Sequence, residues 1–304
     1  MTRTRARALL RISTLAAVLA VVGLVVPDSA VRPADMALVK LQTAEGVDPG
    51  GDDVVWILAV GSDARPGETM TRTRGDALQL IGINPRTSAA TSIGIPRDSY
   101  VSIPGYGSDR INASMVYGGP QLLGETVGNL VGIQPDYVFV TKFPYFIDMV
   151  NDIGGITVHN PRAFSDTGLK PGGFKAGDIH LNGYGAMAFS RIRHSLPGGD
   201  FDRSANQQRT LAGIQARIRQ QADKPGFIEK GVLSVMQHLD TNLAPGELFR
   251  LAQLVAQVDP SKITGCVVQG GFAMIGGASV VTPDTGQARR YGDVARTTAV
   301  IRHC

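Results

Sequence analysis

The feature that most restricts the fold is a series of short apolar segments, several of which end close to an arginine or an aspartate. Their valine and isoleucine content and their flanking Gly, Pro, Asn and Asp residues are typical of buried strands. The strands that we expect are Val54–Val60, Ala77–Ile83, Ala89–Ile95, Tyr137–Thr141 and Ile263–Val268.

Apolar residues at helical spacing lie between and after these strands. The expected helices are Pro120–Val131, Phe146–Ile153, Asp202–Ala222, Phe227–Leu239 and Gly246–Val258. The chain after Val268 is rich in glycine, and we expect it to be irregular. Strands that are mixed with helices in this way predict a layered α/β domain.

The N-terminus carries an export or membrane signal. Four arginines within the first eleven residues precede the apolar stretch Leu15–Val26. Basic residues stay on the cytoplasmic side, so the rest of the chain is expected outside the cytoplasm. The stretch is short for a full span and could be a cleaved signal peptide, but Asp28 at its exit favours a retained single-pass anchor.

The net charge and the two cysteines limit the classes of function that the sequence allows. The formal net charge is +4, which fits an anionic partner, although a GC-rich coding sequence would also favour arginine. The basic residues form no compact cluster, which disfavours nucleic acid. Cys266 and Cys304 could pair in an oxidising compartment or remain as two free thiols.

Two aspartates flank the loop that joins the first two predicted strands. Asp63 and Asp76 would repel each other across this loop unless a cation lay between them. Magnesium takes one or two protein carboxylates together with phosphate oxygens. The alternative is that Asp63 caps a turn and Asp76 is solvated.

Arginines recur beside these carboxylates, where they could bind phosphate or form ordinary salt bridges. Arg97 follows an apolar strand and Pro96, and Asp98 beside it could orient Arg97 or accept a proton. If Phe189–His194 is extended, Arg191 and Arg193 point to the same face. The other candidates are Arg65, Arg74, Arg110 and Arg203, with Gln207 one helical turn after Arg203.

Arg203 would lie in the first turn of its helix, near the positive helix end, which is favourable only beside an anion. No Gly-x-Ser-x-Gly, His-Glu-x-x-His or P-loop pattern occurs, so covalent catalysis by the protein is not expected.

An ordered set of motifs over roughly residues 54–222 resembles the LytR-CpsA-Psr family of extracytoplasmic phosphotransferases. The motifs are Gly61-Ser62-Asp63-Ala64-Arg65-Pro66, Arg74-Gly75-Asp76, Ile95-Pro96-Arg97-Asp98-Ser99-Tyr100-Val101, Ile103-Pro104-Gly105-Tyr106-Gly107, Arg110-Ile111-Asn112-Ala113, Tyr117-Gly118-Gly119-Pro120, Gly154-Gly155-Ile156, Phe189-Ser190-Arg191-Ile192-Arg193-His194 and Gly199-Asp200-Phe201-Asp202-Arg203 with Gln207-Gln208. The resemblance implies a three-layer α/β/α domain with a central mixed sheet and an apolar polyprenyl pocket. It divides the chain into an anchor or signal (1–27), a linker (28–53), a catalytic core (54–222) and a helical and glycine-rich extension that we expect to be specific to a lineage (223–304).

The resemblance also implies an activity. Family members transfer a glycopolymer from a polyprenyl-pyrophosphate carrier to the 6-hydroxyl of N-acetylmuramic acid in peptidoglycan, and so form a phosphodiester. Magnesium, or manganese in its place, would be held by Asp63 and Asp76, and Asp98 would be the base. The pyrophosphate would be bound by Arg65, Arg74, Arg97, Arg110, Arg191, Arg193, Arg203 and Gln207.

Three alternatives remain open at this point. The same residues could serve a polyprenyl-pyrophosphate pyrophosphatase that uses water in place of a sugar hydroxyl. They could also belong to a non-catalytic binder of the lipid carrier, or to an envelope regulator. An external domain without a DNA-reading motif counts against a transcriptional role.

Overall fold

The computed structural model describes residues 36–44, 46–48, 51, 53–228 and 238–304. The predicted anchor, the first part of the predicted linker and most of the predicted helix Phe227–Leu239 lie outside these residues. Within the described part of the chain, no helix is both long and apolar enough to cross a membrane.

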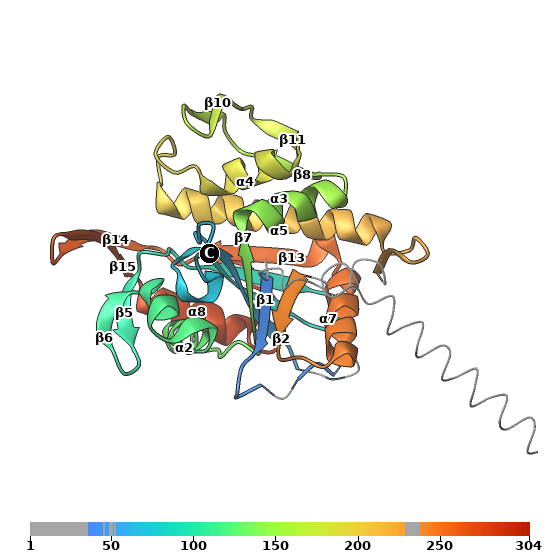
Figure 1. Ribbon diagram of the computed structural model, residues 1–304, viewed down its shortest axis with the longest axis horizontal. Helices are drawn as coiled ribbons and strands as arrows, with labels where there is room; N and C mark the ends of the chain where they lie inside the picture. The colour runs from blue at the N-terminus through green and yellow to red at the C-terminus, as the bar shows by residue number, and fades with distance from the viewer. Residues whose placement is uncertain (1–35, 45, 49–50, 52, 229–237) are drawn as a thin grey trace, which may run out of the picture. The chain divides into compact units, whose positions relative to one another are not determined.

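A seven-stranded mixed sheet forms the centre of the fold, as expected (Figure 1). Its strand order is β12-β1-β7-β2-β3-β4-β13. The pairs β1–β12, β2–β7 and β4–β13 are parallel and the other neighbours are antiparallel. The strands are β1 Met36–Lys40, β2 Val55–Ser62, β3 Gly75–Ile83, β4 Ala90–Gly94, β7 Tyr137–Lys142, β12 Leu239–Thr241 and β13 Ile263–Val267.

Both faces of the sheet are buried, which explains why most of its strands are predominantly apolar and do not alternate with polar residues. Trp56 and Leu58 of β2 point to one face, and Val55 and Ile57 point to the other. The first face packs against α2 (Ala113–Val131) and α8 (Thr285–Ala295), and the second against α7 (Pro245–Gln257). Helix α5 (Asp200–Gln221) lies over β3, β4 and β13 (Figure 1).

A smaller group of elements packs on the outer side of α5 (Figure 1). Its core contains the rings of Phe164, Phe174 and Phe189, whose centroids lie 5.1 to 5.5 Å apart. The elements are α3 Phe143–Asp152, β8 Ile156–Asn160, β9 Phe164–Asp166, β10 Lys170–Phe174, β11 Gly177–Leu181 and α4 Gly183–Arg191.

The predicted linker and extension are corrected by the structure. The range 28–53 contributes β1 to the central sheet, and the range 223–304 contributes β12 and β13. The glycine-rich end of the chain is ordered: β14 (Gly270–Ile275) and β15 (Ala278–Pro283) form a hairpin, and α8 follows it. Gly292 allows α8 to approach α2 closely, because a Cβ there would lie 2.3 Å from the Val131 carbonyl oxygen.

Two further expectations change in detail. Helix α2 begins at Ala113, before the predicted start at Pro120, and bends at Gly119, where φ is 67°. The Phe189–His194 stretch is not extended, because α4 continues to Arg191. Of the two possibilities left open for Cys266 and Cys304, the structure shows the paired one: the disulfide joins β13 to the end of the chain, across a Cα–Cα distance of 5.5 Å.

Candidate functional site

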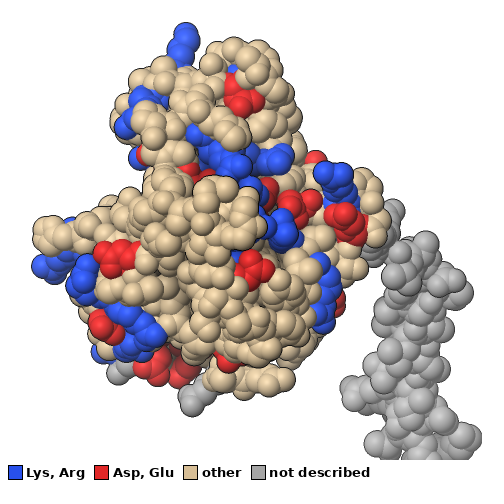
Figure 2. Space-filling model, turned by 90° about the vertical axis from the view of Figure 1, so that its left-hand side faces the viewer, with Lys and Arg blue, Asp and Glu red and all other residues tan. Residues whose placement is uncertain are grey.

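Four arginines and three aspartates from five separate segments meet beside the N-terminus of α5. We call them the clamp cluster: Arg97, Arg110, Arg193, Arg203, Asp76, Asp98 and Asp200. In Figure 2, Lys and Arg side chains gather between the upper and lower parts of the face that is shown, with acidic side chains among them. The turn between β4 and β5 (Tyr100–Ile103) supplies Arg97 and Asp98, and β6 (Gly107–Arg110) supplies Arg110.

Arg97 lies between two carboxylates. Its Nη1 donates a hydrogen bond to Asp76 Oδ1, and its Nε lies 3.6 Å from Asp98 Oδ2. Burial by itself would lower the pKa of Arg97, but the charges of Asp76 and Asp98 outweigh it and raise the pKa. The buried Nε has no hydrogen-bond partner within the described residues, so one strong donor remains for a ligand oxygen.

Asp98 is shared by three guanidinium groups. Besides Arg97 Nε, Arg110 Nη1 lies 3.7 Å from Asp98 Oδ1 and Arg193 Nη1 lies 3.7 Å from Asp98 Oδ2. These separations are ionic contacts that are too long for hydrogen bonds. Asp98 therefore holds the arginines near one another without using up their donors.

Asp200 is the anion that the sequence required near Arg203. It is buried, and its two oxygens each accept a 3.0 Å hydrogen bond, one from Arg193 Nη1 and one from Arg203 Nη2. Burial lowers the pKa of Arg203 against the opposing charge of Asp200, and the charges of Arg97 and Arg193 add to the lowering. Asp200 and Asp202 in the first turn also complement the positive end of α5.

Three of the predicted arginines lie apart from the clamp cluster. Arg191 ends helix α4 and stacks on Phe143 at 4.3 Å from the ring centroid, whereas Arg193 follows the helix and does not share an extended stretch with it. Arg65 is exposed, and no interaction of the described residues joins its side chain to the cluster. Arg74 is exposed and acts electrostatically on Asp63 and Asp109.

Asp63 and Asp76 come close enough to repel. Partial burial, and then the charge of Asp76, raise the pKa of Asp63. Two crowded carboxylates suit a divalent cation that would neutralise both. In the described part of the chain, no group of three or more His, Cys, Asp or Glu side chains is arranged to hold a metal ion, so water and phosphate oxygens would complete the coordination.

Gln207 lies in a buried amide network beneath Arg203. Gln79 Nε2 donates to Gln207 Oε1 at 3.1 Å and to Ser204 Oγ at 3.0 Å, and Ser92 Oγ donates to Gln79 Oε1. The prediction missed Gln79, although a lone glutamine inside an apolar strand was a visible signal. Asp200 was also missed as a site residue; its place between two arginines becomes evident only in the fold.

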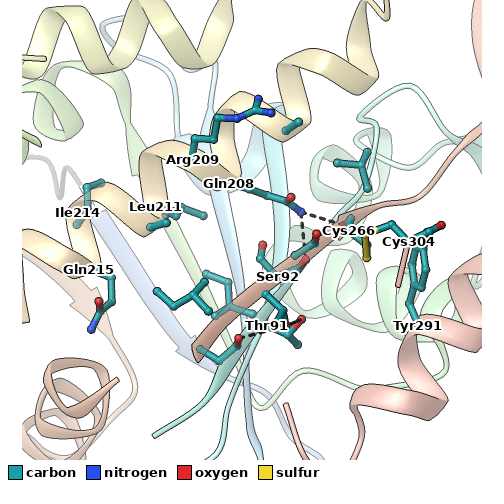
Figure 3. A pocket seen from close by; sticks show the side chains of 18 of the residues that line it. Thr91, Ser92, Gln208, Arg209, Leu211, Ile214, Gln215, Cys266, Tyr291 and Cys304 are labelled. Atoms are coloured by element: carbon teal, nitrogen blue, oxygen red, sulfur yellow. Dashed lines mark hydrogen bonds between the residues drawn. A yellow bond between two sulfur atoms is a disulfide. The ribbon is translucent and has the colours of Figure 1, made fainter. Parts of the chain in front are cut away.

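An apolar cavity of about 770 Å³ lies between α5 and the strands β3, β4 and β13 (Figure 3). Ile81, Ile83, Leu211, Ile214 and Val255 are among its lining residues. Its wall also includes the Cys266–Cys304 disulfide and Gln208, whose Nε2 donates to the Ser92 and Cys266 carbonyl oxygens. The size is within the usual range for a small-molecule site.

The cavity and the clamp cluster share one turn of the chain. Gly198, Phe201 and Asp202 line the cavity, and Asp200 and Arg203 of the same segment belong to the cluster. An apolar chain and an attached anionic group could therefore be bound side by side at the start of α5.

The chain belongs to the LytR_cpsA_psr family, whose sequence model matches residues 32–295. That range includes most of the segment 223–304, which is therefore part of the family's domain and not a lineage-specific extension.

Several characterised proteins are similar to this chain. A polyisoprenyl-teichoic acid–peptidoglycan teichoic acid transferase, TagU of Bacillus licheniformis, is 37% identical over 169 residues, which are 55% of this chain and 53% of TagU. The chain thus matches only about half the length of these curated relatives. The crystal structure of B. subtilis TagV is 28% identical with a TM-score of 0.65, over 79% of this chain and 96% of TagV. A structure of TagT bound to LI-WTA is 26% identical with a TM-score of 0.66, over 86% of this chain and 99% of TagT.

Proposed function

We propose that this chain transfers a glycopolymer from a polyprenyl-pyrophosphate carrier to the 6-hydroxyl of N-acetylmuramic acid in peptidoglycan. The observation that carries the proposal is the junction of the clamp cluster with the apolar cavity at one turn of α5. The names of the TagU relatives, and the binding of LI-WTA by TagT, support a substrate of this class.

In the proposed reaction, the acceptor oxygen attacks the phosphorus that carries the glycopolymer. The bond from that phosphorus to the bridging oxygen breaks, and polyprenyl monophosphate leaves. The product is a phosphodiester between the polymer and the sugar. In phosphoryl transfer the protein contributes chiefly position and charge neutralisation, which is the role that we assign to Arg97, Arg110, Arg193 and Arg203.

The aspartates of the cluster keep the arginines in place before the donor arrives. Asp200 fixes Arg193 and Arg203, and Asp76 fixes Arg97. Because the arginines are already in position, the reaction does not require additional free energy to order flexible cations around the phosphates. We assign Asp98 to orient these cations and to accept the proton of the acceptor hydroxyl, as the sequence suggested.

Asp63 and Asp76 are the residues that we expect to hold magnesium, with manganese as a substitute. Their mutual repulsion supports this assignment, and a bound cation would neutralise charge that develops on the phosphates. Asp76 would exchange part of its contact with Arg97 for the cation.

We further propose that residues 1–27 anchor the chain as a single pass, with the domain on the extracytoplasmic side. The basic residues before the apolar stretch support this orientation. The Cys266–Cys304 disulfide also fits an oxidising compartment.

The test is a reconstituted transfer assay. Full-length protein in detergent is mixed with a polyprenyl-pyrophosphate oligosaccharide and peptidoglycan fragments, with magnesium or with a chelator. Phosphodiester-linked sugar on the peptidoglycan, lost with the chelator, is the expected result. Donor consumption without transfer would instead support a pyrophosphatase, and donor that is bound but left intact would support a binding protein.

A further inference from the structure

Two tyrosines form an exposed aromatic surface that the proposed reaction leaves without a role. Tyr106 lies at the tip of the β5–β6 hairpin, and its ring stacks on that of Tyr117 in α2, with centroids 5.0 Å apart and planes 13° from parallel. Tyr106 is 57% exposed and Tyr117 is 38% exposed. Because Tyr117 covers one face of the Tyr106 ring, the exposed area of Tyr106 includes its opposite face.

The pair is fixed in place and not merely left on the surface. Tyr117 Oη donates a 2.6 Å hydrogen bond to Asp109 Oδ2, and Tyr106 Oη lies 3.4 Å from the Tyr117 carbonyl oxygen. Gly105 and Gly107, with φ of 77° and 79°, make the tight tip that turns Tyr106 outward. A rigid ring that loses little conformational entropy on binding makes an effective contact surface.

Polar groups border the rings. Arg72 Nη1 donates to the Tyr117 carbonyl oxygen at 3.3 Å. Although partial burial would raise the pKa of Asp109, the hydrogen bond from Tyr117 and the charges of Arg110 and Arg74 lower it, so Asp109 is an ionised acceptor. An open aromatic face with a carboxylate and guanidinium groups at its edge suits a pyranose ring, whose C–H groups pack on the ring and whose hydroxyls bond at the edge.

The hairpin connects this surface to the clamp cluster. Strand β5 begins two residues after Asp98, and Arg110, which contacts Asp98, ends β6. Arg110 is four residues after Tyr106 along the chain, and four steps along a strand span about 13 Å. Arg74 acts electrostatically on both Tyr117 and Asp63, and Asp63 in turn is influenced by Asp76 of the clamp cluster.

We propose that Tyr106 and Tyr117 bind the glycan strand of the peptidoglycan acceptor, as a subsite outside the clamp cluster. This inference rests on the proposed function. The acceptor is favoured over the donor polymer because the hairpin extends from Asp98, the residue that we assign to the acceptor hydroxyl. A strand of N-acetylated pyranoses also offers the repeated C–H faces that an aromatic surface needs.

The first experiment measures binding alone. A peptide-free tetrasaccharide of alternating N-acetylglucosamine and N-acetylmuramic acid is titrated into full-length protein and followed by calorimetry. Tyr106→Ala is expected to weaken binding about fivefold to tenfold, and Tyr106→Phe, which keeps the ring, is expected to bind like the wild type. Tyr184→Ala removes an exposed tyrosine of α4 and serves as the matched control.

The second experiment separates the two sugar sources. In the transfer assay, Tyr106→Ala is expected to raise the KM for peptidoglycan fragments and to leave the KM for the donor unchanged. A rise in the donor KM alone would assign the surface to the donor polymer and overturn the proposal. Unchanged binding in Tyr106→Ala, or no binding of the tetrasaccharide to the wild type, would also overturn it, whereas Tyr106-dependent binding without transfer would refute only the proposed function.

Discussion

Breaking the Cys266–Cys304 disulfide tests how the C-terminal segment is held to the sheet. Cys304 is exposed at the end of the chain and Cys266 is buried in β13, so Cys304→Ala removes the bond without opening the core. The bond closes a loop with a sequence separation of 38, which contains β14, β15 and α8. Loop-closure entropy for this length is about 13 cal/mol/K, so the variant is expected to lose about 4 kcal/mol of unfolding free energy.

Urea unfolding followed by circular dichroism measures this loss. With a slope of about 3 kcal/mol/M, the midpoint of the variant should fall by about 1.3 M. Dithiothreitol should lower the wild-type midpoint to the same value and leave the variant unchanged. His303→Ala, a change in the same exposed tail that keeps the disulfide, is the matched control.

Two results would refute this reasoning. A midpoint shift equivalent to less than about 1 kcal/mol would mean that the unfolded loop is already restricted by other means. Quantitative thiol labelling of the native wild type without reductant would mean that the pair is not joined.

The remaining predictions concern the clamp, a titrating pair and a close backbone contact. Arg97→Ala is expected to lower the kcat/KM of transfer about a thousandfold. The control Arg290→Ala, which changes an exposed residue of α8, should leave kcat/KM unchanged. Comparable turnover of the two variants would contradict a role of Arg97 in binding the pyrophosphate. Burial would raise the pKa of Glu247, but hydrogen bonds from Tyr137 and Lys40 outweigh it and lower the pKa. The ionised Glu247 therefore stabilises the folded state fully above the unfolded pKa of about 4.3. This contribution to the unfolding free energy is lost as the pH falls through the folded pKa. The urea-midpoint gap between the wild type and Glu247→Gln should therefore shrink below about pH 4, and a gap that does not depend on pH would contradict the ion pair. Gly183→Ala would place a Cβ 2.0 Å from the Ile147 carbonyl oxygen and should lower the unfolding free energy by about 2 kcal/mol. The control Gly246→Ala, whose Cβ would contact no other atom, should leave the unfolding free energy almost unchanged. Equal urea midpoints for the two variants would argue against the close contact at Gly183.

The sheet could be predicted because burial on both faces leaves a local mark. Strands β2, β3, β4, β7 and β13 are predominantly apolar, and their predicted bounds differ from the observed ones by only a few residues. Strands β1 and β12 were missed because they are short, and because their partners are distant in the sequence. Helix α8 was missed because glycine and arginine hide the spacing of its four buried residues, Ala288, Tyr291, Gly292 and Ala295.

The site could be predicted only in part, since its geometry depends on contacts between distant segments. Arg97, Arg110, Arg193 and Arg203 were expected and do come together. The predicted extended conformation at Arg191 was wrong. The residue ends a helix, and its side chain stacks on Phe143. The pairing of Asp200 with two arginines, and the cavity wall formed by the disulfide, have no signature in sequence spacing.

The central claim is that one site binds a pyrophosphate at the clamp cluster and its prenyl chain in the cavity. The most direct test measures the affinity of full-length protein for polyprenyl pyrophosphate, for the wild type and for one variant at each end. Arg193→Ala removes a clamp cation, and Ala205→Trp fills the cavity from α5. We predict that both variants bind at least tenfold more weakly, whereas wild-type affinity in either variant would contradict the joint site.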